Sequence, residues 1–199
     1  VRPRGTLADL LRGPALLRDA LLVIGFSLFM ALCAQISIPL PWTPVPITGQ
    51  TLGFLLAPAV LGPQRGLLAA LLYLGQGAIG LPVFAPSAAL PNGFARLMGP
   101  TGGHLMAAPI AAVVVGYLAA RGWDRRLLSG LAMFLIGTVL ILMIGAIWLN
   151  IYKETFQLGT LHQLLWAGVY PYLPGEAVKI ALAALAMRGC WELFGRQHP

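Results

Sequence analysis

Long apolar stretches alternate with short polar or proline- and glycine-rich connections along almost the whole chain. The apolar stretches cover about residues 20–38, 49–61, 64–79, 102–120, 127–149 and 174–193. About 20 apolar residues in a helix cross the ~30 Å hydrocarbon core of a bilayer. We therefore predict an all-α integral membrane protein that is a bundle of six transmembrane helices.

The second and third stretches are short for a membrane span, and only Gly62 and Pro63 separate them. They could form two tilted spans or one re-entrant pair. Two spans are favoured, because most other span counts would scatter the chain's arginines over both sides of the membrane.

Two connections differ from ordinary loops. Residues 39–48 contain four prolines, which excludes a helix and predicts a stiff, extended segment. This segment is apolar, so we expect it to lie over protein or ligand. Residues 80–100 form a long connection rich in glycine and proline, and connections of this length often act as lids or binding loops.

Composition supports the membrane assignment, with 58% hydrophobic and only 10% charged residues, against about 25% charged in soluble domains. The net charge of +7 does not indicate nucleic-acid binding, because the basic residues lie at the ends of apolar stretches. Cys33 and Cys190 offer neither a disulfide framework nor metal-ligand spacing.

The basic residues are divided unequally between the two sides of the six predicted spans. Ten arginines fall on the side of the termini, at positions 2, 4, 12, 18, 65, 121, 125, 126, 188 and 196. The opposite loops carry only Arg96 and Lys153, and Lys179 is left inside a span. Since cytoplasmic loops are enriched in Lys and Arg, both termini are predicted to be cytoplasmic.

Residues 1–18 are polar and rich in arginine, and we expect them to form a cytoplasmic N-terminal segment ahead of a membrane substrate-binding domain at 19–199. A cleavable signal peptide is the alternative interpretation. No clear small-x-small cleavage site follows, so an uncleaved segment is the prediction.

Glu176 and Lys179 are the most informative polar pair, because they lie in the first turns of the last apolar stretch. A charged side chain within a membrane helix costs roughly 2.5–3.5 kcal/mol on insertion scales, so such residues are functional candidates. Their i,i+3 spacing places both on one helix face, within reach of a shared ligand. Alternatively, Glu176 caps the helix at the outer interface while Lys179 extends to the headgroups or pairs with it.

Further polar residues fall on the same outer side. Arg96 is a basic residue on the outer side, where the positive-inside rule does not call for one. It could bind a ligand carboxylate or remain a solvated loop charge. Gln50, Asn92 and Arg96 could meet Glu176 and Lys179 in one outward pocket beneath the proline-rich connection. Tyr73 and Gln76 form a polar stripe that must face protein or a cavity.

A catalytic site is not indicated. His104, His162 and His198 lack the i,i+4 partner of a zinc helix, and His104 is expected to be a small polar contact. The Pro100–Gly103 stretch lacks the Gly-Lys-Ser/Thr ending of a phosphate-binding loop. If transport uses ATP, other chains must hydrolyse it.

On the first span, Ser27 and Ala31 form a small-x-x-x-small pair, which could pack inside the bundle or form a partner interface.

Five motifs occur in an order that closely resembles the BioY family, the biotin-binding S component of energy-coupling factor (ECF) vitamin transporters. They are the stretches at 35–41, 44–53, 80–84, 99–103 and 174–179, and the resemblance covers about residues 20–193. The family usually has Asp where this chain has Glu176, and frequently Tyr where it has His104.

The resemblance implies a six-helix protein of the bacterial cytoplasmic membrane that captures biotin from the outer face without a cofactor. It also implies partnership with an ECF membrane scaffold subunit and two ATPase subunits, which would hydrolyse ATP.

The chemistry of biotin suits the candidate residues. Glu176 could accept from a ureido N–H, and Lys179 could donate to the ureido oxygen or to the carboxylate. Arg96 or Asn92 could hold the other polar end, while Gln50 and Thr48 close the site. Apolar walls are expected from Trp42, Tyr73, Phe84 and Trp148. The alternatives are capture of another small vitamin, an intramembrane enzyme using Glu176 and His104, and a passive channel.

Overall fold

The computed structural model describes residues 5–11, 13–41, 43, 45–87 and 92–194. Its long helices are α1 (Ala15–Gln35), α2 (Gln50–Leu61), α3 (Pro63–Ala78), α5 (Gly102–Ala120), α6 (Leu127–Leu149) and α8 (Leu173–Phe194). Shorter elements lie between them, namely α4 (Phe94–Leu97), α7 (Leu161–Gly168), the 3-10 turns η1 (Leu7–Leu10), η2 (Trp123–Arg125), η3 (Asn150–Tyr152) and η4 (Tyr170–Tyr172), and the strands β1 (Ser37–Ile38) and β2 (Ile47–Thr48).

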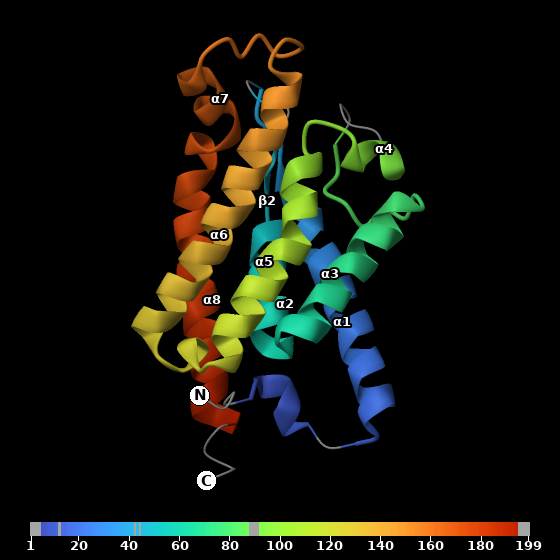
Figure 1. Cartoon of the computed structure of the whole chain (residues 1–199), viewed down its shortest axis with the longest axis vertical. Coiled ribbons are helices and arrows are strands. Elements are labelled where there is room, and N and C mark those ends of the chain that lie inside the picture. The colour runs from blue at the N-terminus through green and yellow to red at the C-terminus, as the bar shows by residue number, and fades with distance from the viewer. Residues whose placement is uncertain (1–4, 12, 42, 44, 88–91, 195–199) are drawn as a thin grey trace.

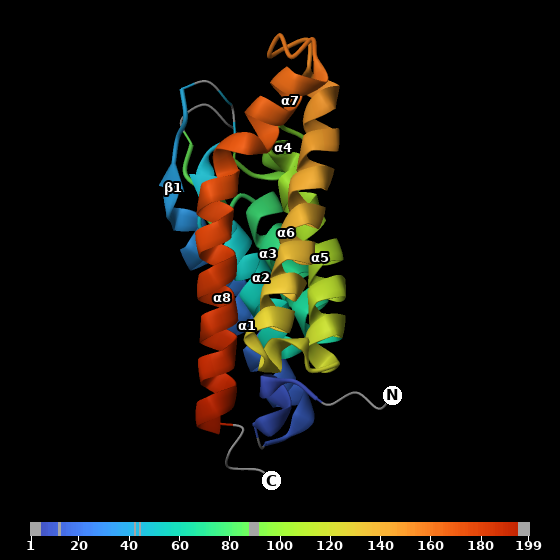
Figure 2. The same ribbon diagram turned by 90° about the vertical axis from the view of Figure 1, so that its left-hand side faces the viewer.

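The long helices run along one axis and form an elongated, all-α bundle (Figures 1 and 2). At one end lie η1, the α2–α3 turn, η2 and the last turns of α8, and at the other end lie α4, α7 and the strands (Figures 1 and 2). Among the described residues, Ala15–Gln35, Gly102–Ala120 and Leu127–Tyr152 are long and apolar enough to cross a membrane, and α2 is a shorter apolar helix.

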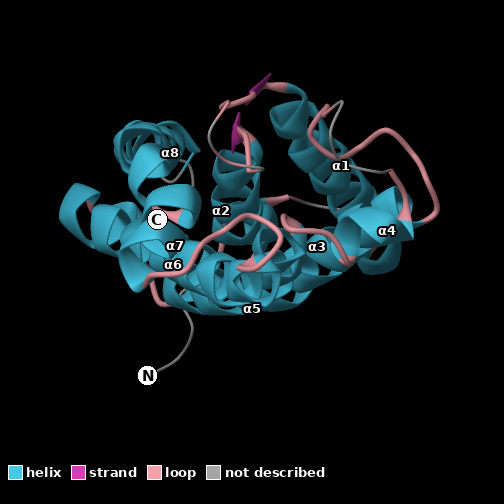
Figure 3. Ribbon diagram, turned by 90° about the horizontal axis from the view of Figure 1, so that it is seen from above, coloured by secondary structure: helices cyan, strands magenta, loops and turns pink. Residues whose placement is uncertain are grey.

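Glycines let the helices approach closely where α5 packs against α3 and α6 (Figure 3). A Cβ at Gly116 of α5 would lie 2.5 Å from the backbone nitrogen of Pro63 at the start of α3. A Cβ at Gly137 of α6 would lie 2.6 Å from side-chain atoms of Leu55 and Val115. Small residues at such crossings are typical of membrane bundles, where packing replaces the hydrophobic effect.

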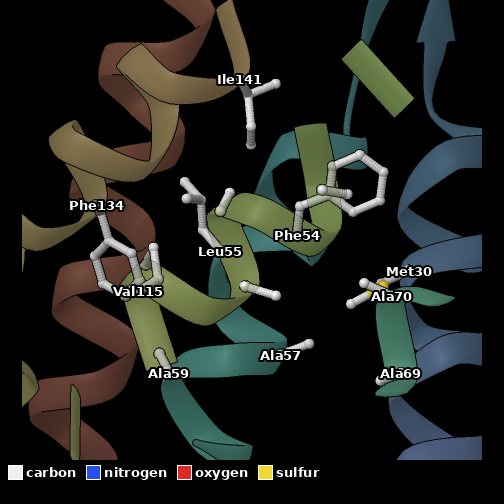
Figure 4. Packing of buried hydrophobic residues seen from close by; sticks show 14 of the residues in the cluster. Met30, Phe54, Leu55, Ala57, Ala59, Ala69, Ala70, Val115, Phe134 and Ile141 are labelled. Atoms are coloured by element: carbon white, nitrogen blue, oxygen red, sulfur yellow. The ribbon is translucent and has the colours of Figure 1, made fainter. Parts of the chain in front are cut away.

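The core is built mostly from alanine and a few large side chains. Leu55, Val115 and Phe134 meet between α2, α5 and α6, and Phe54 and Ile141 lie at the upper edge of the same cluster (Figure 4). Many large apolar side chains remain exposed, including Leu17, Leu28, Leu32 and Ile147. An apolar exterior of this kind suits contact with lipid.

The proline-rich connection contains structure that the sequence pattern did not predict. β1 and β2 pair antiparallel, with Ser37 opposite Thr48. Proline lacks an N–H, but both strands lie outside the prolines, so their backbone groups remain free to pair. The pairing ties the end of α1 to the start of α2 and holds the connection across the top of the bundle.

Ser27 is fully buried in the chain's own bundle and its hydroxyl donates to the carbonyl of Ile24 at 2.9 Å. Ser27 thus packs inside the chain's own bundle. Ala31 is partly exposed and also packs against the core.

An ion-pair network fastens the first described residues to the bundle. Arg65 of α3 binds Asp9 of η1 at 2.9 Å and Asp19 of α1 at 3.1 Å. Arg18 completes the network through Asp19. Asp9 and the first turns of α1 are therefore packed against α3, and α1 begins at Ala15, before the predicted start of the first span.

Asp124 joins the α5–α6 turn to the far end of α8. It is 1% exposed, and one carboxylate oxygen accepts from the Trp191 indole N–H at 2.5 Å. The Arg125 guanidinium lies 4.3 Å from the centre of the Trp191 ring. Burial raises the pKa of Asp124 from 3.8 to about 6, although the Trp191 hydrogen bond and the Arg125 charge oppose this.

The raised pKa of Asp124 predicts a pH dependence of stability. Because the folded state holds this proton more tightly, the contribution of Asp124 is largest at low pH and is lost as pH rises from about 4 through about 6. Asp124→Asn keeps an acceptor for Trp191 without the charge. We expect the variant to gain thermal stability over the parent at pH 8 and much less at pH 5, measured by unfolding in detergent. Glu154→Gln, at an exposed carboxylate, is the control, and an equal change at both pH values would contradict the prediction.

Candidate functional site

A cavity lies in the upper half of the bundle, beneath the strands and between α2, α5, α6 and α8. Its volume is about 60 Å³, smaller than the roughly 300–1,000 Å³ of typical ligand pockets. Its apolar wall consists of Val45, Pro46, Phe54, Phe84, Ala85, Leu105, Ile141 and Leu142. Its polar lining consists of Thr48, Gln50, Thr51, Arg96, Thr101, His104, Tyr172 and Glu176.

Glu176 and Lys179 form a buried ion pair at one side of this cavity. Lys179 Nζ lies 2.5 Å from Glu176 Oε1 and also donates to the carbonyl of Thr48 at 2.7 Å. Thr51 Oγ1 donates to the same Glu176 oxygen at 3.0 Å. Glu176 is 4% exposed and so does not face water at the helix end, but its pairing with Lys179 is one that the alternative interpretation also included. Lys179 reaches no lining position itself and instead holds Glu176 and β2 in place.

A second group of hydrogen bonds positions Gln50. Its amide nitrogen donates to the Tyr73 hydroxyl at 2.7 Å, and that hydroxyl donates to the carbonyl of Val83 at 3.1 Å. Thr48 Oγ1 donates to Gln50 Oε1 at 3.3 Å. Tyr73 is fully buried behind the lining, between the rings of Phe54 and Phe84. Tyr73 therefore supports the wall, while Thr48, Gln50 and Phe84 form it.

Arg96 is buried at 2% exposure on α4, inside the long connection, and one guanidinium nitrogen donates to the carbonyl of Ala85. Burial lowers the pKa of Arg96 below its ordinary value, and the neighbouring Tyr73 partly opposes this. Arginine still stays protonated in proteins. The structure thus excludes the solvated loop charge, because this cation lies in the cavity wall.

Three lining residues present polar atoms that are shielded from solvent and have no hydrogen-bond partner among the described residues. They are Arg96 Nη1, Thr101 Oγ1 and Glu176 Oε2. Buried polar groups are nearly always paired in folded proteins. Their gathering around one cavity indicates a site that is completed by a polar ligand.

Not every predicted residue reaches the site. Asn92 is exposed and does not line the cavity, whereas Phe84, Ala85 and Arg96 of the same connection do. Trp148 is also absent from the lining, and its indole donates to the carbonyl of Gly99 at 2.9 Å, which fixes the turn before α5. Trp42 lies outside the described residues.

The cavity lining also includes Thr51, Thr101 and Tyr172, which the sequence did not predict as site residues. His104, which was expected to be only a small polar contact, lines the cavity too. Thr51 directly follows Gln50, so a helical wheel could have placed it on the face of α2 that contacts Glu176 of α8. Tyr172 is recognisable only in three dimensions, because its hydroxyl donates to the carbonyl of Val45 at 2.7 Å across the bundle. Among the described residues, no cluster of His, Cys, Asp or Glu could hold a metal ion.

Fold and site together define a helical membrane protein with a ligand cavity enclosed at one end of its bundle. The sequence model of the BioY family matches residues 6–196. The chain therefore belongs to the BioY family.

Curated relatives agree with this assignment. The chain is 38% identical over 162 residues to a protein of Pyrococcus horikoshii named probable biotin transporter BioY, which covers 80% of this chain and 89% of the relative. It is 35% identical over 176 residues to the biotin transporter BioY of Rhizobium etli, covering 86% of this chain and 91% of that protein.

The fold also matches a solved structure. The crystal structure of the S-component for biotin from an ECF-type ABC transporter superposes with a TM-score of 0.78 at 23% sequence identity. The match covers 92% of this chain and 95% of the other. At this identity the likeness concerns the fold, and the S-component bundle is the one observed here.

Proposed function

We propose that this protein is a membrane-embedded S component that captures biotin from the outer face of the bacterial cytoplasmic membrane. The observation that carries the proposal is the set of unpaired polar atoms around the cavity. Glu176 Oε2 is a charged acceptor and Arg96 Nη1 is a cationic donor, and apolar walls lie between them. Biotin offers N–H donors at its ureido end, an apolar bicycle, and a carboxylate at its tail. Its two polar ends thus complement the two charged groups of the cavity.

We assign the ureido ring to Glu176 and the carboxylate to Arg96. Glu176 Oε1 is already occupied by Lys179 and Thr51, so Oε2 remains to accept a ureido N–H. A carboxylate beside Glu176 would meet like charge, whereas Arg96 offers the planar donor arrangement that carboxylates prefer.

The proposed topology has six spans, with both termini in the cytoplasm. The described arginines at 18, 65, 121, 125, 126 and 188 all belong to the end of the bundle formed by η1, η2 and the last turns of α8. Arg96 and Lys153 belong to the opposite end. The positive-inside rule then directs the cavity end outward.

Transport across the membrane would require partners, which we propose are an ECF scaffold subunit and two ATPase subunits. The name of the structural neighbour, a component of an ECF-type ABC transporter, supports this context. Capture of another small vitamin by the same bundle is the second candidate. A ligand with an N–H donor at one end and an anion at the other would satisfy both charged groups of the cavity.

Equilibrium binding of labelled biotin to the protein in detergent tests the function. We expect saturable binding of unmodified biotin, competition by excess unlabelled biotin, and no competition by thiamine or riboflavin. Mass spectrometry of ligand retained through purification should identify biotin. Retention of a different vitamin with no biotin binding would refute the assignment, and chemical turnover of the bound molecule would indicate an enzyme instead.

A further inference from the structure

The start of α5 lies in the cavity wall, where Thr101 is a lining residue. The dipole of this 19-residue helix places partial positive charge here, and the first N–H groups of a helix have no partner within it. Gly102 N–H donates to the carbonyl of Gly99 at 2.9 Å. No backbone carbonyl of the described residues accepts from the N–H groups of Gly103 or His104. This helix end therefore offers backbone donors suited to an anion.

Thr101 directly precedes the helix, a position where a threonine hydroxyl ordinarily accepts from an N–H of the first turn. Its backbone is helical, with φ −87° and ψ −4°, and its side chain makes no such capping bond. The residue is 7% exposed, and its Oγ1 has no partner among the described residues. Thr160, at the same position before α7, accepts from the N–H of Gln163 at 3.2 Å. The Thr101 hydroxyl is thus left for a group that enters the cavity.

Arg96 lies beside this helix end because α4 packs directly against the start of α5. A Cβ built on Gly102 would overlap the carbonyl oxygen of Leu97, so the two backbones approach closely only because Gly102 has no side chain. Arg96 precedes Leu97 and Thr101 precedes Gly102, so two buried, unpaired donors that line the cavity come from adjoining backbone.

The other side of the cavity has the opposite character. Glu176 of α8 is the only acid among the described lining residues. Seen from above, α4 and α8 lie on opposite sides of the bundle (Figure 3). A carboxylate placed near Glu176 would meet like charge, whereas at the start of α5 it would meet a guanidinium, a hydroxyl and backbone N–H groups.

We infer that the start of α5 and Arg96 together form the anion-binding end of the cavity, where the Thr101 hydroxyl and the free N–H groups of the first turn bind the carboxylate of the ligand. The inference rests on the proposed function, and it extends the contact assigned to Arg96 into a site built by two elements. Arg96 supplies the net positive charge. The hydroxyl and the N–H groups fix where the carboxylate oxygens lie.

Two substitutions of Thr101 test the hydroxyl. Thr101→Val keeps the shape of the side chain and removes the donor, whereas Thr101→Ser retains it. A hydrogen bond to a charged group corresponds to roughly a 10- to 100-fold change in Kd. We expect Thr101→Val to weaken biotin binding by at least about tenfold, and Thr101→Ser to stay close to the parent. Biotin amide carries no charge, so its affinity, measured by competition with labelled biotin, should fall much less in Thr101→Val.

Thermal unfolding without ligand provides a readout that separates binding from a structural role. Because the Thr101 hydroxyl makes no capping bond, Thr101→Val should leave the unfolding temperature unchanged or raise it, since a buried unpaired hydroxyl is removed. Thr160→Val is the matched control. It removes a cap that is formed, so it should lower the unfolding temperature and leave both affinities unchanged. A Thr101→Val variant that unfolds at lower temperature and loses biotin and biotin amide equally would overturn the inference.

The backbone donors can be observed in the parent protein without any substitution. Gly103–His104 is the only Gly–His pair in the chain, so labelling glycine with ¹³C at the carbonyl and histidine with ¹⁵N reports a single amide. Biotin should shift the His104 amide proton downfield, because a carboxylate accepts from this turn. Biotin amide should shift it much less.

These experiments distinguish the two levels of inference. If the parent protein does not bind biotin, the proposed function fails. If the parent binds biotin while Thr101→Val binds biotin and biotin amide with parental affinities, or biotin leaves the His104 amide signal unmoved, the function stands and the anion site at the start of α5 is refuted.

Discussion

Glu176→Gln should weaken biotin binding on the order of 100-fold, because it removes the charged acceptor of the ureido N–H. The substitution keeps the length and shape of the side chain. The amide oxygen of Gln can still accept the hydrogen bond from the Thr51 hydroxyl. It also leaves Lys179 without the carboxylate that lies 2.5 Å from its nitrogen. Titration with labelled biotin in detergent measures the effect.

A second variant separates binding from folding. Breaking one partner of a buried ion pair costs about 3–5 kcal/mol, whereas replacing both partners by neutral groups is often tolerated. The double variant Glu176→Gln/Lys179→Met should therefore recover thermal stability relative to Glu176→Gln and remain defective in binding. A double variant that regains biotin affinity would show that the single substitution acted through stability alone.

Glu192→Gln is the matched control on the same helix. Glu192 pairs with Arg188 at 2.8 Å, but both side chains are about half exposed at the opposite end of α8. Exposed pairs of this kind contribute about 0–1 kcal/mol. Biotin affinity should be unchanged, and a loss equal to that of Glu176→Gln would mean that charge on α8, and not the cavity contact, governs binding.

The sequence predicted the helices well because membrane insertion leaves a simple pattern. Uncharged runs mark the long helices, and prolines and glycines mark their ends, so the observed bounds of α2, α5 and α6 lie within a residue or two of the predicted stretches. The start of α1 was missed because Arg18 and Asp19 look like a polar boundary. In the structure they lie inside the helix, since Asp19 is neutralised by Arg18 and Arg65.

Charge made two cavity residues conspicuous in the sequence, and the uncharged Thr48, Gln50 and Phe84 were also predicted and line the cavity. Glu176 and Arg96 stand out because an ion in an apolar context is expensive, and both line the cavity. Thr51 and Thr101 carry no such signal, because threonine is common in helices and at their ends. Asn92 was predicted to line the cavity because it is polar and close to Arg96 in the chain. In the structure it is exposed and does not line the cavity.

Arg96→Met should lower the affinity for biotin on the order of 100-fold, because truncating one partner of a buried charge pair costs about 2–5 kcal/mol. The guanidinium is 2% exposed and keeps Nη1 unpaired in the cavity wall. Biotin amide lacks the negative charge, so its weaker binding should change little in the variant. The ratio of the two Kd values, measured in parent and variant, reports the contact between Arg96 and the carboxylate.

The same residue also anchors its connection, because it donates to the carbonyl of Ala85 beside Phe84, and the experiment must separate this role from ligand binding. A structural defect would weaken biotin and biotin amide equally and would lower the unfolding temperature. Loss of the carboxylate contact would affect biotin alone. Lys153→Met removes an exposed cation at the outer end and should leave both affinities unchanged. An equal loss for acid and amide in Arg96→Met would place the biotin carboxylate elsewhere and reverse the orientation assigned to the ligand.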